Sequence, residues 1–341
     1  MSLQIKNDQS LDRESVLRNF LEAGKHALEE GRSAEAVQTL RAALELADQT
    51  PGQDALKLAI LEQLVLATRA SSGAEVALPL QKRVVAMREA PDQAYHLPTA
   101  LALLAILYDE MEKPREAGAC VERAVKLVEA LDETLPMTLA VAGAMAEALR
   151  HRGMHLDAAE KLMQKTVRGL ILVLGEEDVE VAAARVGLAC VMNQLDRGEE
   201  AGALLKEAIE VLATEDKPRE ALGEGLMVLA QLRAQAEAYE EAEGLFMRAE
   251  ATYRSLLGPE APEVLGCRFQ RGAVYREQGK FAEAEALFRE ALEGLDESDD
   301  SERAAIANVA ESYADLLKTL GRKEEAKALR ERAKAMRGSG D

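Results

Sequence analysis

The chain is poor in aromatic residues, cysteine and proline, and these shortages narrow the choice of fold. Of its 341 residues, 48% are apolar but only 3% are aromatic, and there is no tryptophan. A core without rings has to be built from Ala, Leu and Val. These residues suit closely packed helices, because Ala has the best helix propensity and lets two backbones approach. With only 9 prolines to interrupt helices, the composition predicts an all-α protein.

The three cysteines are widely separated and do not indicate a disulfide framework. Cys120, Cys190 and Cys267 form no CxxC pair, and an odd number of cysteines does not close into pairs. The polar N-terminus lacks the apolar run of a signal peptide. No stretch approaches the roughly 18 consecutive apolar residues that a membrane span needs. The sequence therefore predicts a reduced, cytoplasmic protein.

Acidic side chains outnumber basic ones, which bears on the class of partner. The chain has 61 Asp and Glu against 42 Lys and Arg, giving a formal net charge of −19. Such a surface repels a phosphate backbone, and the sequence shows no concentrated basic stripe that would override the average. We therefore expect neither nucleic acid nor an anionic membrane as a partner. The acidic surface could attract a basic segment of another protein.

The main signal in the sequence is an internal repeat. An alanine recurs at intervals of 40 to 43 residues, and a bulky apolar residue follows four residues later in six of the eight units. The exceptions at this second position are Gln81 and Arg330, and Lys165 is an exception seven residues after the alanine. Small residues at such a position allow two helices to touch, while large ones fill the groove between hairpins. The recurring alanines are Ala36, Ala77, Ala117, Ala158, Ala201, Ala242, Ala284 and Ala326.

The stretch from Arg271 to Leu292 resembles a tetratricopeptide repeat, with Gly272 in the first helix and Gly279 at the turn. The units have about 42 residues instead of the common 34, so each is longer by about two helical turns. Units of this length resemble those of kinesin light chains and their bacterial relatives, which begin with a Leu-Gly-x-x-x-Pro-like connector. The segment Leu257-Gly-Pro-Glu-Ala-Pro262 matches that connector well.

The resemblance implies one α-α superhelix of about eight helical hairpins over residues 15–337, with tails at 1–14 and 338–341. Arg330 takes a position where inner units have Leu or Phe, as expected of a terminal unit with a polar outer face. The acidic run at 297–302 is expected to be a solvated connector.

The resemblance also implies where a ligand would bind, because the first helix of each tetratricopeptide unit lines the concave face. These positions give an apolar floor with a polar row along one side, which suits an extended peptide or an amphipathic helix. The alternative is that packing between helices fills them. Groove asparagines that grip a peptide backbone in kinesin-light-chain-type units are scarce here, which favours an apolar or helical ligand. The groove candidates are Arg69, Ile106, Asp109, Glu147, Arg150, Val186, Cys190, Asn193, Met227, Gln231, Phe269 and Arg276.

The sequence contains no arrangement typical of catalysis or of a cofactor. His151 and His155 are four residues apart, but Gly153 between them is expected at a turn, which breaks the helical geometry of a metal-binding pair. Free cysteines in Ala-rich helices are typically small core residues. We therefore expect no catalytic, metal or cofactor site. The leading interpretation is a non-catalytic scaffold or adaptor that binds a protein or peptide. The alternatives are a signal-responsive regulatory protein and a self-assembling structural protein without a groove ligand.

Overall fold

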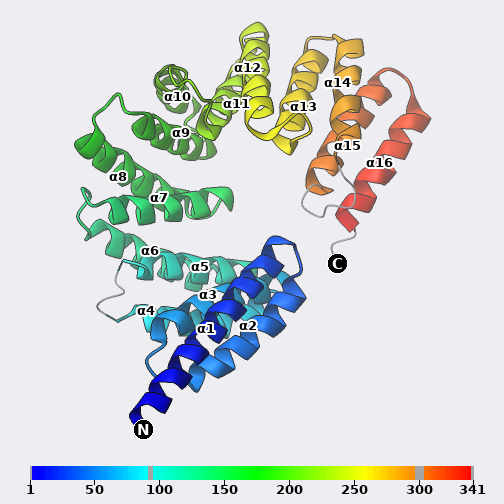
Figure 1. Ribbon diagram of the computed structural model, residues 1–341. Helices are drawn as coiled ribbons and strands as arrows, with labels where there is room; N and C mark the ends of the chain where they lie inside the picture. The colour runs from blue at the N-terminus through cyan, green and yellow to red at the C-terminus, as the bar shows by residue number, and fades with distance from the viewer. Residues whose placement is uncertain (1, 91–94, 296–302, 339–341) are drawn as a thin grey trace. The chain divides into compact units, whose positions relative to one another are not determined.

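The computed structural model describes residues 2–90, 95–295 and 303–338, with the side chains of residues 2–12 and 338 left out. Within these ranges the chain forms sixteen α-helices and no strand (Figure 1). The prediction of an all-α repeat of about eight helical hairpins is confirmed. The first helix begins at Ser2, so the expected N-terminal tail is helical where it is described. The acidic run at 297–302 and the end of the C-terminal tail lie outside the described residues.

Consecutive helices pair as eight hairpins, each made of an odd-numbered first helix and an even-numbered second helix. Their bounds are α1 Ser2–Glu29 and α2 Ser33–Asp48; α3 Asp54–Ser72 and α4 Ala74–Arg88; α5 Leu97–Glu110 and α6 Pro114–Glu129; α7 Pro136–His151 and α8 Leu156–Leu174; α9 Val179–Gln194 and α10 Gly198–Leu212; α11 Glu220–Gln235 and α12 Tyr239–Leu257; α13 Pro262–Glu277 and α14 Phe281–Glu293; α15 Arg303–Thr319 and α16 Lys323–Gly338.

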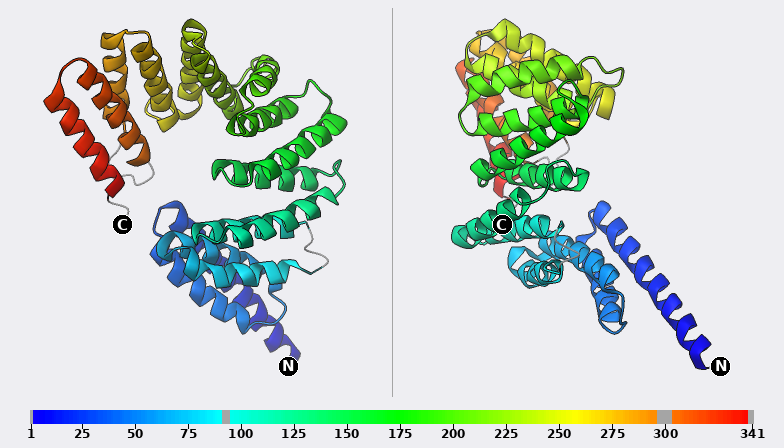
Figure 2. Two further views of the ribbon diagram at one scale, coloured as in Figure 1. Left: turned by 180° about the vertical axis from the view of Figure 1, so that it is seen from behind. Right: turned by 90° about the vertical axis from the view of Figure 1, so that its left-hand side faces the viewer.

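The chain divides into two compact units, unit 1 at residues 1–169 and unit 2 at residues 170–341, with the boundary inside α8. Within unit 2, each second helix contacts the first helix of the next hairpin, and successive first helices α9, α11, α13 and α15 contact one another (Figure 2). Unit 1 repeats this scheme, with α2 on α3, α4 on α5 and α5 on α7. Each hairpin therefore packs mainly on its neighbours in sequence, as in other repeat proteins. The single continuous superhelix stays a prediction.

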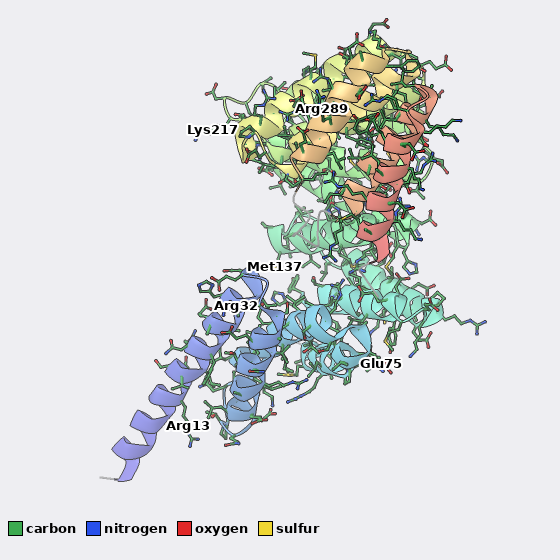
Figure 3. All side chains as sticks on the ribbon, turned by 90° about the vertical axis from the view of Figure 1, so that its right-hand side faces the viewer. Arg13, Arg32, Glu75, Met137, Lys217 and Arg289 are labelled. Atoms are coloured by element: carbon green, nitrogen blue, oxygen red, sulfur yellow. The ribbon has the colours of Figure 1, made fainter. Side chains whose placement is uncertain are left out.

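Acidic residues mark the start of every second helix in the described part of the chain. Glu75 in α4 is one of them and is labelled in Figure 3. A carboxylate in the first turn is favourable because the N-terminus of a helix carries a partial positive charge. Part of the chain's negative charge therefore serves helix initiation. The acidic first-turn residues are Glu35, Glu75, Glu116, Asp157, Glu199, Glu200, Glu240, Glu241, Glu283, Glu324 and Glu325.

The recurring alanines lie where the two helices of a hairpin touch, and seven of the eight are buried. In the fourth hairpin the structure corrects the sequence analysis: Ala158 is only half-buried, and the neighbouring Ala159 is 0% exposed. The turn before α8 is the cause. Gly153 stands three positions before the start of α8 at Leu156, and both Gly153 and His155 have left-handed backbones, with φ of 62° and 46°. In six of the other seven hairpins a left-handed residue stands two positions before the second helix, as Gly279 does before α14.

The extra turn residue also explains why Lys165 departs from the repeat pattern. Counted from Ala159, the seventh residue is Thr166, which is buried, so Lys165 is one position away from the expected small residue. The Lys165 ammonium group donates to the carbonyl oxygens of Glu129 and Leu131 at 3.1 and 2.8 Å. Carbonyls at the C-terminal end of a helix lack intrahelical donors, so a cation satisfies them well. Lys165 thereby holds α8 to the end of α6.

One glycine in α8 is required by a close backbone approach. A Cβ atom placed on Gly169 would lie 2.2 Å from the carbonyl oxygen of Glu133 and 2.3 Å from Cδ2 of Leu139. The oxygen belongs to the backbone, so it cannot swing away as a flexible side chain would. Gly169 therefore allows α8 to pack against the connection between α6 and α7.

We expect Gly169→Ala to lower the free energy of unfolding by about 2–4 kcal/mol, because the added methyl group overpacks this contact. The matched control is Gly244→Ala in α12, where an added Cβ meets no atom within 4 Å. There alanine should stabilise the helix by about 0.5–1 kcal/mol through its higher propensity. Urea unfolding followed by circular dichroism measures both effects. Equal stability of the two variants would contradict the packing described for Gly169.

In unit 2, one buried carboxylate joins α12 to α13. The Glu250 side chain is 9% exposed and accepts hydrogen bonds from three arginines. Arg268 Nε donates at 3.0 Å and Arg271 Nη1 at 2.8 Å, both from α13, while Arg254 Nη2 donates at 2.5 Å from α12 itself. Charge-assisted bonds of this kind are strong only while both partners remain, because the surviving charge is left desolvated when one is removed.

Glu250→Gln should therefore destabilise the chain by about 2–4 kcal/mol, since it leaves Arg268 and Arg271 without a counter-charge in a largely buried position. Glu207→Gln in α10 is the control, because Glu207 is exposed and bonds to no other described residue. It should change the stability by less than about 0.5 kcal/mol. Thermal unfolding of both variants at neutral pH makes the comparison, and a Glu250→Gln protein as stable as the control would show that the ion pairs contribute nothing net.

Candidate functional site

In unit 1, three of the four charged groove candidates, Arg69, Glu147 and Arg150, form ion pairs within the chain. Arg69 Nη2 lies 2.7 Å from Glu110 Oε1, and Arg152 Nη1 lies 2.6 Å from the same oxygen. Arg150 is buried, and its Nε donates to Glu147 Oε2 at 2.7 Å. These arginines already have intramolecular carboxylate partners. An incoming ligand would have to break those pairs to use them.

The other two candidates in unit 1 do not form a site with these ion pairs. Ile106 is buried in the core, as expected from the packing alternative, and Asp109 is exposed at the end of α5. The arginine candidates of unit 1 are therefore already paired, and Asp109 stands apart from them.

In unit 2, four candidates belong to the core or its edge. Val186 and Cys190 of α9 are buried. The half-buried Phe269 packs against Phe288, with ring centroids 5.7 Å apart. Met227 Sδ lies 3.3 Å from Cys267 Sγ. Packing therefore accounts for most of the surface of these side chains.

Burial also determines the state of the cysteines. Burial raises the pKa of the Cys267 thiol to about 12, and it raises the pKa of the half-buried Cys120 thiol as well. Because the thiolate is the nucleophilic form, Cys267 is held as an unreactive thiol at neutral pH. The described residues also contain no group of three or more His, Cys, Asp or Glu that could hold a metal ion. In the described ranges, none of the helices combines the length and the apolar character needed to cross a membrane.

The remaining candidates, Asn193, Gln231 and Arg276, are half-buried on the first helices of unit 2. Arg276 Nη2 donates to its neighbour Glu277 at 2.9 Å, so its charge is already balanced. Asn193 and Gln231 belong to a larger set of amide side chains on these helices. None of the set hydrogen-bonds to another described residue. The members of this amide row are Asn193, Gln194, Gln231, Gln235, Gln270 and Asn308.

Three glutamines of the amide row surround one cavity. The cavity has a volume of about 320 Å³ and lies between α11, α12 and α13. Gln231, Gln235 and Gln270 line it together with the buried side chains of Phe246 and Val274. Each carboxamide offers both a donor and an acceptor. The cavity thus combines an apolar floor with unpartnered groups that can bond to a peptide backbone.

The sequence analysis named Gln231 and Arg276 as groove candidates, and both line this cavity, but it missed Gln235 and Gln270. It considered only asparagine as the amide that grips a peptide backbone. The signal that could have found these residues is the recurrence of amides over α9, α11, α13 and α15.

Comparison with known proteins identifies the repeat. The family model of the tetratricopeptide repeat matches residues 222–297 and 269–339, which confirms the prediction of tetratricopeptide repeats. No curated protein matches the chain in sequence.

Solved structures with a similar fold span most of the chain. The apo form of the quorum sensor NprR from B. thuringiensis is 13% identical, covers 98% of this chain and 91% of its own, and gives a TM-score of 0.57. A Rap protein complexed with competence and sporulation factor is 12% identical, covers 96% and 98%, and gives 0.50. TPR-like repeats of a Podosopora anserina kinesin light chain are 23% identical, cover 58% and 95%, and give 0.47.

Proposed function

We propose that this tetratricopeptide-repeat chain is a non-catalytic scaffold that binds a segment of another protein on the first helices of unit 2. The observation that carries the proposal is the cavity between α11, α12 and α13, where Gln231, Gln235 and Gln270 have no partner among the described residues. A polar side chain gains most from a ligand when no internal bond has to be broken first. On the first helices of unit 1, by contrast, the candidates Arg69 and Arg150 are already paired with carboxylates.

The polar side chains that line the cavity indicate what kind of segment would bind. Arg276 is neutralised by Glu277, so the cavity does not select for a carboxylate. The carboxamides can donate to main-chain carbonyls and accept from main-chain N–H groups, while Phe246 and Val274 offer an apolar surface to one side chain. We infer an extended segment, bound through its backbone, that places one apolar side chain in the cavity. This revises the sequence-based preference for a helical ligand.

A signal-responsive regulatory role is the second candidate function. It is favoured by the similarity in fold to a quorum sensor and to a Rap protein complexed with competence and sporulation factor. Both candidate functions use a bound peptide, and they differ in whether binding changes the activity of a further partner. Both candidate functions include a cytoplasmic location, since the three cysteines are free.

The test is a peptide selected from a random 12-residue library displayed on phage, with the full chain as bait. Its affinity is then measured by calorimetry against the wild type and a Gln231→Leu, Gln235→Leu, Gln270→Leu variant. Leu keeps much of the volume of Gln but removes its hydrogen-bonding groups. Three lost bonds of about 1 kcal/mol each should weaken binding by about 100-fold.

Gln63→Leu is the matched control, because Gln63 occupies in α3 of unit 1 the repeat position that Gln270 occupies in α13. It should leave the affinity unchanged. Failure to select any binding peptide, or selected peptides that bind the triple variant as tightly as the wild type, would refute the proposed site.

A further inference from the structure

Helix α16, drawn in red in Figure 1, carries a continuous line of basic side chains on one face. Their spacing of four, three, four and three residues keeps them aligned along an α-helix. All five are exposed. We call this line the basic stripe; its members are Lys323, Lys327, Arg330, Lys334 and Arg337. The sequence analysis was wrong in finding no concentrated basic stripe, because acidic residues stand between these positions along the chain and disguise their alignment.

The basic stripe occupies the positions through which inner second helices pack on the next hairpin. Counted from the recurring alanine, Arg330 corresponds to Phe288 in α14 and Lys334 corresponds to Leu292. Both of these inner residues are buried, and α14 contacts α15. In α16 the same face is exposed and cationic. The stripe is therefore a helix-stacking face whose chemistry has changed from apolar to basic.

At two of these positions, α12 of unit 2 has glutamates, which are opposite in charge to the lysines of α16 and bond to the next first helix. Lys334 corresponds to Glu250 of α12, which accepts hydrogen bonds from Arg268 and Arg271 of the next first helix. Lys327 corresponds to Glu243 of α12, which accepts from the hydroxyl of Tyr275 on that helix. In the repeat, these positions can thus hold a charged side chain that bonds to a helix lying across it. With lysines in place of glutamates, that helix has to supply carboxylates.

The stripe is only partly neutralised by its own hairpin. Arg330 Nη2 lies 2.8 Å from Asp315 Oδ1, and Arg337 Nη1 lies 2.6 Å from Glu311 Oε1, both on α15. The side chains of Lys323, Lys327 and Lys334 bond to none of the described residues. Charged residues of either sign would keep this face soluble, whereas five cations in a line repel one another. Such a row in a chain with a net charge of −19 indicates selection for an acidic partner.

We propose that the basic stripe of α16 docks an acidic helix of another protein, which lies along α16 as α13 lies along α12. The occupant is a helix because the stripe coincides with the face that receives a helix in every inner hairpin of unit 2. Its carboxylates should follow the spacing of Arg268, Arg271 and Tyr275, three and then four residues apart. Duplex nucleic acid fits less well, since Glu324 and Glu325 stand in the first turn of the same helix. This surface is separate from the amide row and does not depend on the function proposed for it.

The test uses a fluorescent Ala-rich helical peptide with glutamates spaced three and four residues apart in alternation, and a second peptide with glutamine at those positions. Fluorescence anisotropy at low ionic strength should show binding of the glutamate peptide alone. The full chain is compared with its Lys323→Gln, Lys327→Gln, Lys334→Gln variant. This variant should bind at least about tenfold more weakly, and added salt should weaken the wild-type complex.

The matched control carries Lys126→Gln, Lys161→Gln and Lys217→Gln, which remove the same charge from exposed lysines outside α16; Lys217 is labelled in Figure 3. This control should bind like the wild type, and circular dichroism should show equal helicity for all proteins. The proposal is overturned if the α16 variant keeps full affinity, or if both peptides bind equally. It is also overturned if the stripe binds duplex DNA or phosphatidylserine vesicles but not the glutamate peptide.

Discussion

The closeness of the two helices in each hairpin determines the rest of the structure. In the seventh hairpin, a Cβ on Gly272 would lie only 2.8 Å from the ring of Phe288. The small residue in the first helix and the small Ala284 in the second allow this approach, and the large ring then fills the space between hairpins. This contact fixes the rotation of each helix. It therefore decides which first-helix side chains are left for a ligand and which second-helix side chains receive the next hairpin.

The same scaffold carries different chemistry in its two units. In unit 1, Arg69 and Arg152 pair with Glu110, so these charged side chains are satisfied internally. On the first helices of unit 2, amides without internal partners surround a cavity with an apolar floor. Since a ligand gains little from groups that already have partners, we propose that the binding site lies in unit 2. The cationic face of α16 adds a second surface that depends on the same repeat geometry.

The sequence was sufficient to predict the all-α repeat, its period and seven of the eight helix-contact alanines. A count of residues could not locate the eighth, because the left-handed His155 adds a residue to one turn and moves the contact to Ala159. Groove positions such as Ile106 and Val186 are buried in the core, as the packing alternative predicts.

The candidate site was less predictable than the fold, because it depends on which polar groups lack partners. Ion pairs such as Arg69–Glu110 join residues of different hairpins, so their formation cannot be read from one helix at a time. The basic stripe of α16 became visible only once its face was identified as the stacking face. In both cases the residues were present in the sequence, and their neighbours determined their role.

Hydrogen–deuterium exchange of the full chain, with and without a peptide selected from the random library, tests the central claim most directly. If the first helices of unit 2 form the binding surface, the peptide should slow exchange in α11 and α13, whose side chains line the cavity. Exchange in unit 1 should be unchanged. Protection confined to the second helices, or to the first helices of unit 1, would contradict the account.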